Sequence, residues 1–217
     1  MYTLCMWYLL VIAILSAYFS ARLIFMIMQL LTGKCNVRMR KQPLRTLIVI
    51  GSGGHTSEML RLMKHLNKQK FTPRLYVLAD TDTTSQVRLE KEENGTDWTT
   101  AVIPRSRHVN QSYSSSVVST LYSIVMTIPV VISFKPDLIL CNGPGTCVPV
   151  CLVGFVMRLF HYTDTSIVFV ESICRVKTLS LTGKIMCFFA DLIIVQWPEL
   201  KQKYRWRVKY VDEDISL

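Results

Sequence analysis

The chain has 217 residues, half of them hydrophobic, with a mean hydropathy of +0.30 and a formal net charge of +10. This length accommodates one domain with a short appendage and excludes two full-sized domains. The seven cysteines show no Cys-x-x-Cys spacing and the four histidines are scattered, so a disulfide framework and a protein-held metal are not expected.

The first predicted element is a membrane-spanning helix at the N-terminus. Eighteen uncharged residues run from Leu4 to Ala21, and the apolar stretch continues to Leu31. About 20 apolar residues span the hydrocarbon core of a bilayer. A cleaved signal peptide is the alternative, but this run is too long for one and no basic residue precedes it. We therefore expect residues 1–31 to form an uncleaved transmembrane anchor.

Basic residues follow the predicted anchor, whereas no lysine or arginine precedes it. They are Lys34, Arg38, Arg40, Lys41 and Arg45. The positive-inside rule places this side of the membrane, and everything downstream, in the cytosol. Arg22, late in the span, is expected to extend toward the same side. Residues 32–43 are thus predicted to be a basic juxtamembrane linker.

Beyond the linker, strand-like and helix-like segments alternate. Short apolar runs bounded by turn residues predict strands at 44–50, 74–79, 101–103, 137–141, 166–170 and 192–195. A helical stripe of apolar residues covers 56–68. This alternation predicts an α/β fold, with one Rossmann-like, doubly wound parallel sheet at residues 44–207 and an atypical acidic tail at 208–217.

One uncharged segment, residues 117–134, has two possible placements. It is long enough for a second membrane span. Its serines and threonines, together with Pro129, lower its tendency to insert. A helix packed on the sheet or lying in the membrane interface is therefore favoured over a second span.

A glycine-rich loop directly follows the first predicted strand. It comprises Gly51, Ser52, Gly53, Gly54, His55 and Thr56. Glycines allow close approach of a ligand to the backbone, and the N-terminus of the following helix favours phosphate. A plain turn between strand and helix would need only one glycine. A dinucleotide site would need glycine at position 56, although Asp80 could serve as its acidic residue, so an NAD(P) oxidoreductase is the weaker alternative.

A second loop of the same kind follows the predicted strand at 137–141. It contains Asn142, Gly143, Gly145 and Thr146. Loops at the carboxyl ends of parallel strands converge on one crevice, where ligands of open α/β sheets bind. Glu171 follows the strand at 166–170 and reaches the same edge, where it could deprotonate a hydroxyl or simply be an exposed turn residue.

Several separate segments resemble one family. GSGGHTSEML, the IPRSR at 103–107, KPDLILCNGPGTCVP, VESICRV and ADLIIVQWPELKQKY resemble the family of membrane-anchor subunits of the split eukaryotic UDP-N-acetylglucosamine transferase. The resemblance runs from about Thr46 to Tyr204. More distantly, the same loops look like the N-terminal half of MurG, a bacterial GT-B enzyme that adds GlcNAc to a lipid diphosphate.

The resemblance implies a divided enzyme. This chain would be the acceptor-binding half of a GT-B fold at the endoplasmic reticulum membrane, and a cytosolic donor-binding subunit would hold UDP-GlcNAc. The acceptor would be dolichyl-diphospho-GlcNAc, which gains a second, β1,4-linked GlcNAc. The chain would be inactive alone, and neither a cofactor nor nucleic acid is expected as a partner.

The resemblance also suggests roles for individual residues. The first glycine loop, Gly51 to Gly54 with Thr56, and the second loop would bind the acceptor and its phosphates. His55 is the first candidate for the catalytic base, and Glu171 the second. The C-terminus departs from the family, because three consecutive acids from Asp212 replace the short tail that packs on the donor subunit. Docking of the partner is therefore left open.

Overall fold

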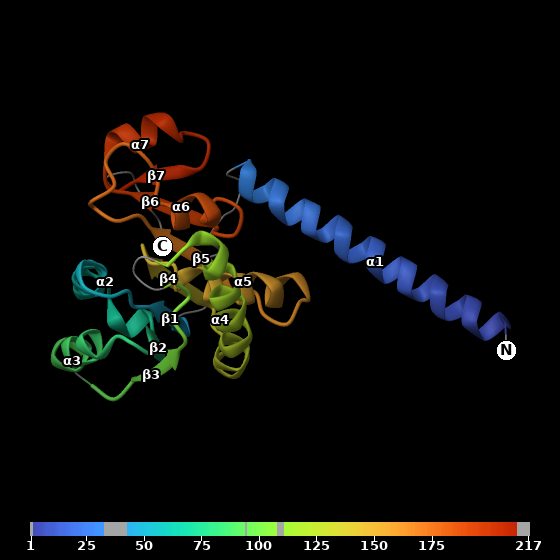
Figure 1. Ribbon diagram of the computed structural model, residues 1–217, viewed down its shortest axis with the longest axis horizontal. Coiled ribbons are helices and arrows are strands. Elements are labelled where there is room, and N and C mark those ends of the chain that lie inside the picture. The colour runs from blue at the N-terminus through green and yellow to red at the C-terminus, as the bar shows by residue number, and fades with distance from the viewer. Residues whose placement is uncertain (1, 33–42, 94, 108–110, 212–217) are drawn as a thin grey trace.

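The computed structural model describes residues 2–32, 43–93, 95–107 and 111–211. The N-terminal helix α1 (Tyr2–Leu31) extends away from an α/β domain that contains all the other elements (Figure 1). Most of the predicted linker and the acidic residues of the tail lie outside the described residues.

The described residues form one sheet of seven parallel strands, which confirms the predicted fold class. The strands are β1 (Thr46–Val49), β2 (Arg74–Ala79), β3 (Trp98–Ile103), β4 (Leu138–Asn142), β5 (Ser166–Val170), β6 (Leu192–Val195) and β7 (Val208–Tyr210). Their order is β3-β2-β1-β4-β5-β6-β7. The direction of winding therefore reverses between β1 and β4, and this reversal creates a crevice at their carboxyl ends. β7 lies within residues 208–217, the segment that the sequence analysis assigned to the tail, and it pairs with β6.

Helices cover both faces of the sheet. Helices α2 (Gly54–His65) and α3 (Thr83–Glu92) pack on one face; α4 (Tyr113–Phe134), α5 (Cys147–Leu159), α6 (Leu181–Met186) and α7 (Pro198–Lys203) lie on the other. In β1, Ile48 faces α2, whereas Leu47 and Val49 face α5. Since both faces are buried, the inner strands β1, β2, β4, β5 and β6 are mostly apolar throughout rather than alternating, whereas the edge strands β3 and β7 are partly exposed.

Helix α4, which contains the ambiguous segment 117–134, has an inverted pattern of polarity. It packs against α5 and β3 through a face that contains buried hydroxyl side chains at Ser116, Ser123 and Thr127. Its opposite, exposed face is apolar. That face includes Val117, Val118, Leu121, Tyr122, Val125, Met126, Ile128 and Ile132. A helix at a water-exposed surface has the reverse arrangement, so this pattern is typical of a helix that borders lipid.

The second half of α1 packs on the α/β domain. Met26 and Leu30 are buried in the core cluster that also contains α5. The guanidinium of Arg22 donates hydrogen bonds to the carbonyls of Arg158 (2.7 Å) and Leu159 (2.8 Å). These carbonyls lie at the C-terminal end of α5, where helix carbonyls lack partners within the helix. Arg22 therefore links the anchor to the domain.

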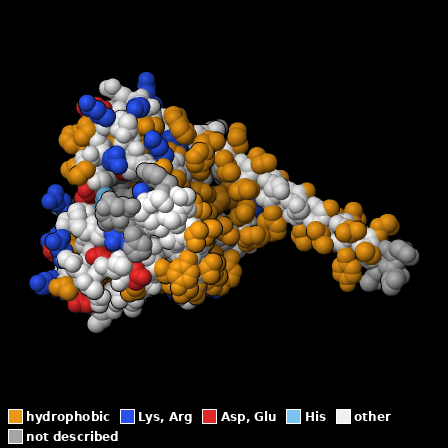
Figure 2. Space-filling model, viewed as in Figure 1, with side chains coloured by type: hydrophobic (Ala, Val, Ile, Leu, Met, Phe, Trp, Pro, Cys, Tyr) orange, Lys and Arg blue, Asp and Glu red, His pale blue; other side chains and the backbone are white. Residues whose placement is uncertain are grey.

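The surface of the molecule divides by chemical character. Hydrophobic side chains gather over the region of α4 and continue along α1, whereas lysine and arginine side chains are most evident on the side away from α1 (Figure 2). By length and composition, two described helices could cross a membrane, at 5–31 and 114–134. The apolar region and α1 thus form one continuous side of the molecule.

Candidate functional site

The two glycine loops follow β1 and β4 and pack against each other at the reversal of the sheet. A Cβ atom on Gly51 would lie 2.5 Å from Cγ of Pro144, so a larger residue would push the loops apart. Gly143 has a φ of +71°, and a Cβ there would overlap the imidazole of His55. Glycine is required at both positions because each backbone passes close to the other loop.

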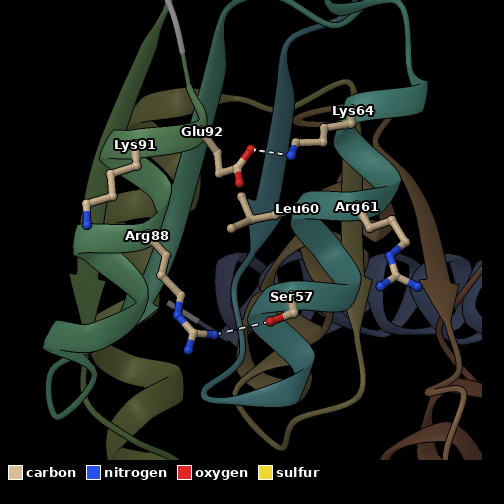
Figure 3. Close-up of a pocket in the computed structure, with 7 residues that line it drawn as sticks. All are labelled: Ser57, Leu60, Arg61, Lys64, Arg88, Lys91 and Glu92. Carbon is tan, nitrogen blue, oxygen red and sulfur yellow. Dashed lines mark hydrogen bonds and ion pairs between the residues drawn. The ribbon is translucent and has the colours of Figure 1, made fainter.

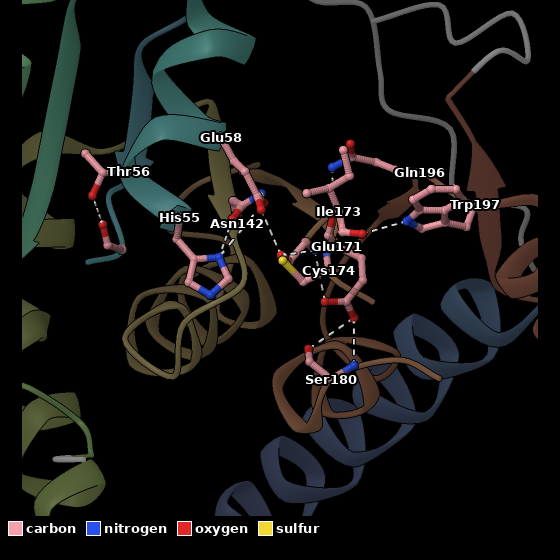
Figure 4. A network of polar contacts seen from close by, with 12 residues as sticks. His55, Thr56, Glu58, Asn142, Glu171, Ile173, Cys174, Ser180, Gln196 and Trp197 are labelled. Atoms are coloured by element: carbon pink, nitrogen blue, oxygen red, sulfur yellow. Dashed lines mark hydrogen bonds and ion pairs between the residues drawn. The ribbon is translucent and has the colours of Figure 1, made fainter. Parts of the chain in front are cut away.

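His55 lies at the first turn of α2 and borders a pocket of about 510 Å³. The ring is partly exposed, and its Nδ1 lies 2.9 Å from Oδ1 of Asn142 (Figure 4). Other residues lining this pocket include Gly143, Ser172 and Arg175. An imidazole that is held on one side and open to a pocket on the other can accept a proton from a bound hydroxyl.

A smaller pocket, of about 80 Å³, lies on the other side of the packed loops. It is lined by Ser52, Gly145 and Thr146 together with two arginines, Arg105 and Arg107. The Arg105 guanidinium donates a hydrogen bond to Ser52 Oγ at 2.9 Å. The sequence predicted the two loops but assigned no role to these arginines. Their position after β3, a third strand end at the same edge, was the available signal.

Helix α4 holds the segment that carries Arg105. The hydroxyl of Ser123 donates to the carbonyl of Pro104 at 2.8 Å, and the hydroxyl of Ser119 donates to the carbonyl of Ser106 at 2.7 Å. These bonds come from the polar inner face of α4, whose outer face is apolar. One helix therefore both holds a wall of the smaller pocket and forms part of the apolar side of the molecule.

The remaining loop residues divide by accessibility. Ser52, Gly53, Gly54 and Gly145 are at least partly exposed at the crevice, near the N-termini of α2 and α5. The backbone amides of a helix N-terminus and its positive dipole favour an anion. This arrangement, with two arginines beside it, suits a phosphate or diphosphate.

Among the predicted loop residues, Thr56, Asn142 and Thr146 have buried side chains, and those of Thr56 and Asn142 have polar partners within the protein. Thr56 is fully buried, and its hydroxyl donates to the carbonyl of Gly51 beneath the loop. Asn142 and Thr146 are 2% and 5% exposed. Asn142 contacts His55 and Glu58, whereas Thr146 precedes the first turn of α5. The structure thus places Thr56 behind the first loop rather than in the crevice.

Glu171 is fully buried at the floor of the larger pocket. Its carboxylate accepts hydrogen bonds from the backbone N–H of Ser172 at 3.1 Å and from the N–H of Ser180 at 2.9 Å. The hydroxyl of Ser180 donates to the same carboxylate at 3.1 Å. Glu171 therefore joins the two ends of the segment between β5 and α6, which forms one wall of the pocket.

A third hollow, of about 560 Å³, lies between α2 and α3 (Figure 3). Lys64 and Glu92 form an ion pair across it at 2.7 Å, and Arg88 donates to Ser57 Oγ at 3.2 Å. Exposed pairs of this kind contribute at most about 1 kcal/mol. The hollow contains no residue of the crevice, so its exposed Arg61 provides a control position for tests of charge.

Cysteine reactivity can report on the larger pocket. Burial raises the pKa of the Cys141 and Cys147 thiols, which lie in the core beside the second loop, whereas Cys174 is exposed and lines the pocket. We expect N-ethylmaleimide to modify Cys174 at least about tenfold faster than either buried thiol, since burial shields those two thiols and their raised pKa leaves little reactive thiolate. Mass spectrometry of the native chain measures this. Equal modification of all three thiols would contradict the described burial.

The fold and crevice define the class of protein. A parallel sheet wound about a reversal point, with glycine loops and arginines at that point, is typical of a Rossmann-like domain that binds its ligand at this edge of the sheet. The fold is similar to that of Acinetobacter baumannii MurG, with a TM-score of 0.55 and 15% identity over 73% of this chain and 43% of that protein. This similarity establishes the fold alone.

The chain belongs to the Alg14 family. A family model described as "Oligosaccharide biosynthesis protein Alg14 like" matches residues 46–212. The chain is 48% identical to the UDP-N-acetylglucosamine transferase subunit ALG14 of Mus musculus over 175 residues, which cover 76% of this chain and 80% of the mouse protein. It is 45% identical over 174 residues to the Homo sapiens subunit, with the same coverages. It is 40% identical to the Schizosaccharomyces pombe subunit over 180 residues, covering 79% and 85%.

These findings confirm the resemblance inferred from the sequence motifs. They favour a transferase subunit over the NAD(P) oxidoreductase. The sequence already argued against the oxidoreductase, because its dinucleotide motif requires a glycine at the position of Thr56.

Proposed function

We propose that this chain is the membrane-anchoring, acceptor-binding subunit of a UDP-GlcNAc transferase. The complete enzyme adds the second, β1,4-linked GlcNAc to dolichyl-diphospho-GlcNAc on the cytosolic side of the endoplasmic reticulum membrane. Support comes from the names of the relatives, which are transferase subunits, and from the presence of one Rossmann-like domain in the described residues. A GT-B enzyme needs two such domains, and the relatives are named as transferase subunits, so we assign the half that holds UDP-GlcNAc to a cytosolic partner and expect this chain alone to be inactive.

The crevice carries the proposal, because its two pockets match the two polar parts of the acceptor. The exposed glycine amides, Arg105 and Arg107 would bind the diphosphate. The larger pocket beside His55 would receive the GlcNAc. The inner face of α4 holds the arginine segment while its outer face is apolar, so a polyprenyl chain attached to the diphosphate could leave directly along the lipid side.

The membrane arrangement follows from α1 and α4 together. Helix α1 would cross the bilayer, with its basic C-terminal side in the cytosol. Because the second half of α1 is packed on α5, the apolar face of α4 is held close to the same membrane. Helix α4 would then lie in the interface rather than span it, since its inner face packs on the domain.

The chemistry requires a base and a stabilised leaving group. In an inverting transfer, the 4-hydroxyl of the acceptor loses its proton to His55 Nε2 as the oxygen bonds to C1 of the donor GlcNAc. The bond from C1 to the phosphate oxygen breaks, and UDP leaves with the electron pair, stabilised by the partner. We assign Glu171 to holding the pocket wall, because its carboxylate already accepts three hydrogen bonds.

Reconstitution with the partner tests the proposal. The chain is expressed with the cytosolic donor-binding subunit, and isolated membranes are assayed for GlcNAc transfer from UDP-GlcNAc to phytanyl-diphospho-GlcNAc. We expect transfer with the pair and none with either chain alone. Retention of the partner on the membranes is measured in the same samples, because the atypical C-terminus leaves docking open. A retained but inactive pair would contradict the proposal.

The Arg105→Met variant tests the diphosphate assignment. Hydrogen bonds to charged groups contribute about 1.5–3 kcal/mol, so we expect the KM for the acceptor to rise roughly 10- to 100-fold with a smaller change in kcat. The control is Arg61→Met, which removes the same charge from the hollow between α2 and α3. Equal effects of the two variants on KM would show that only the overall charge matters.

A further inference from the structure

A chain of hydrogen bonds lies behind His55. Ser172 Oγ donates to Oε1 of Glu58 at 2.8 Å, and the Asn142 side-chain amide donates to Oε2 of Glu58 at 2.9 Å. Oδ1 of Asn142 lies 2.9 Å from Nδ1 of His55 (Figure 4). The four side chains come from α2, the end of β4 and the segment after β5, so the contacts exist only in the folded domain.

The chemistry of these groups fixes the direction of each bond. An ionised carboxylate only accepts, so the NH₂ group of Asn142 must face Glu58. The carbonyl oxygen of Asn142 therefore faces His55, and it can only accept. Nδ1 of His55 must then carry the hydrogen. In the neutral ring, Nε2 then has a lone pair that can accept a proton. His55 is more exposed than Glu58, and both line the larger pocket.

We propose that Glu58 and Asn142 are positioning residues that hold His55 in the tautomer required of a base. The inference rests on the proposed function of His55 and extends it to two residues that need not touch the substrate. The acceptor hydroxyl gives its proton to Nε2, Nδ1–H remains bonded to Asn142, and the ring becomes an imidazolium. Oε2 of Glu58, 3.9 Å from Nδ1, then stabilises the positive charge.

The surroundings of His55 favour this division of roles. Asn142 is 2% exposed and the Glu58 side chain 18% exposed, whereas the His55 side chain is 33% exposed. The other charged groups around the same pocket are Glu171, which is bonded to Ser172 and Ser180, and Arg175 on the pocket wall. Ser172 occupies Oε1 of Glu58, so this carboxylate is held in place from both sides.

The Glu58→Gln variant, in the membrane-bound complex with the partner, separates a positioning role from a structural one. Glutamine can donate as well as accept, so it no longer dictates the orientation of Asn142. We expect kcat to fall by about 10²-fold, within the contribution typical of a general base, with little change in the acceptor KM. Loss of the negative charge disfavours the imidazolium, so the acidic limb of the pH–kcat profile should move to lower pH.

Two further variants complete the test. Asn142→Leu removes the acceptor for Nδ1–H and should lower kcat to a similar extent. The double variant should be no worse than the more damaging single variant, because both changes break one chain of bonds. The control is Glu90→Gln, which removes an exposed carboxylate of α3 and should leave kcat and the pH profile unchanged. Partner retention and thermal unfolding are measured for every variant.

The outcomes distinguish this inference from the function on which it rests. If His55→Gln abolishes transfer while Glu58→Gln and Asn142→Leu keep the wild-type kcat and pH profile, the positioning role is overturned and the base assignment stands. If His55→Gln itself retains full activity, His55 is not the base, and the positioning role that depends on it is overturned as well. If the Glu58 and Asn142 variants lower kcat additively and the acidic limb of the pH–kcat profile does not move, the changes only damage the structure. That result would also overturn the inference.

Discussion

Replacing His55 with glutamine should lower kcat for GlcNAc transfer by about 10²- to 10⁴-fold, the range by which a general base accelerates proton transfer. Glutamine can preserve a hydrogen bond toward Asn142, but its amide cannot accept the proton of the acceptor hydroxyl. The acceptor KM should change little, because the diphosphate is bound by the loops and arginines. Initial rates at saturating UDP-GlcNAc, in membranes that contain both subunits, measure this.

The matched control is His65→Gln at the exposed C-terminal end of α2; His65 is the last residue of that helix and lies outside both crevice pockets. It should retain the wild-type rate. If His55→Gln also retains that rate with the complex intact, the chain only recruits its partner and contributes no catalytic group. That result would leave the membrane-anchoring role and remove the proposed chemistry.

Replacing Gly143 with alanine should have an effect of similar size, although the change is a single methyl group. The Cβ would occupy the space of the His55 imidazole, and the backbone is already at a φ of +71°. The ring must then leave Oδ1 of Asn142, which it now contacts at 2.9 Å. We expect kcat to fall by about 10²-fold, because the base is displaced from its position. Partner retention should be normal.

A double variant shows whether Gly143 acts through His55. Once His55 has been replaced by glutamine, the additional Gly143→Ala change should cost little further kcat, because the base is already absent. A further loss as large as that in the wild-type background would mean that Gly143 matters for another reason, such as contact with the acceptor itself.

The inner strands of the sheet could be predicted well because they are buried on both faces and therefore stand out as apolar runs. The expected ranges 74–79, 166–170 and 192–195 coincide with β2, β5 and β6. The short strand β7 was missed because its residues, Val208–Tyr210, lie in an alternating basic segment without an apolar run. Helix α3 was missed because its moderately polar sequence buries little more than Leu89 and Ser85.

Helix α4 shows that the amino-acid composition of a segment does not by itself predict the environment of the helix. Its serines and threonines suggested a reduced affinity for lipid, yet Ser116, Ser123 and Thr127 are buried against the domain and the exposed face is apolar. Composition averages over the two faces, whereas the environment of the helix depends on which residues share a face. The sequence could not reveal which face the sheet would cover.

The position of the candidate site could be predicted as far as local motifs reach, whereas the roles of its residues stay predictions. Both glycine loops and His55 could be located because each follows directly after a strand. Glu58 was not recognised because it lies within a helix, where a glutamate usually marks a solvated face. Its contact with Asn142, 84 residues away, arises only from the tertiary fold. Arg105 was missed for the same reason, since its partner Ser52 is 53 residues distant.

Equilibrium binding to this chain without its partner tests the central claim most directly. The full chain is placed in lipid nanodiscs, and binding of phytanyl-diphospho-GlcNAc is compared with binding of UDP-GlcNAc. We expect saturable binding of the lipid acceptor, weakened at least about tenfold by Arg105→Met and not competed by UDP-GlcNAc. Tight binding of UDP-GlcNAc by this chain, or no binding of the acceptor by the folded chain, would contradict its assignment as the acceptor half of the enzyme.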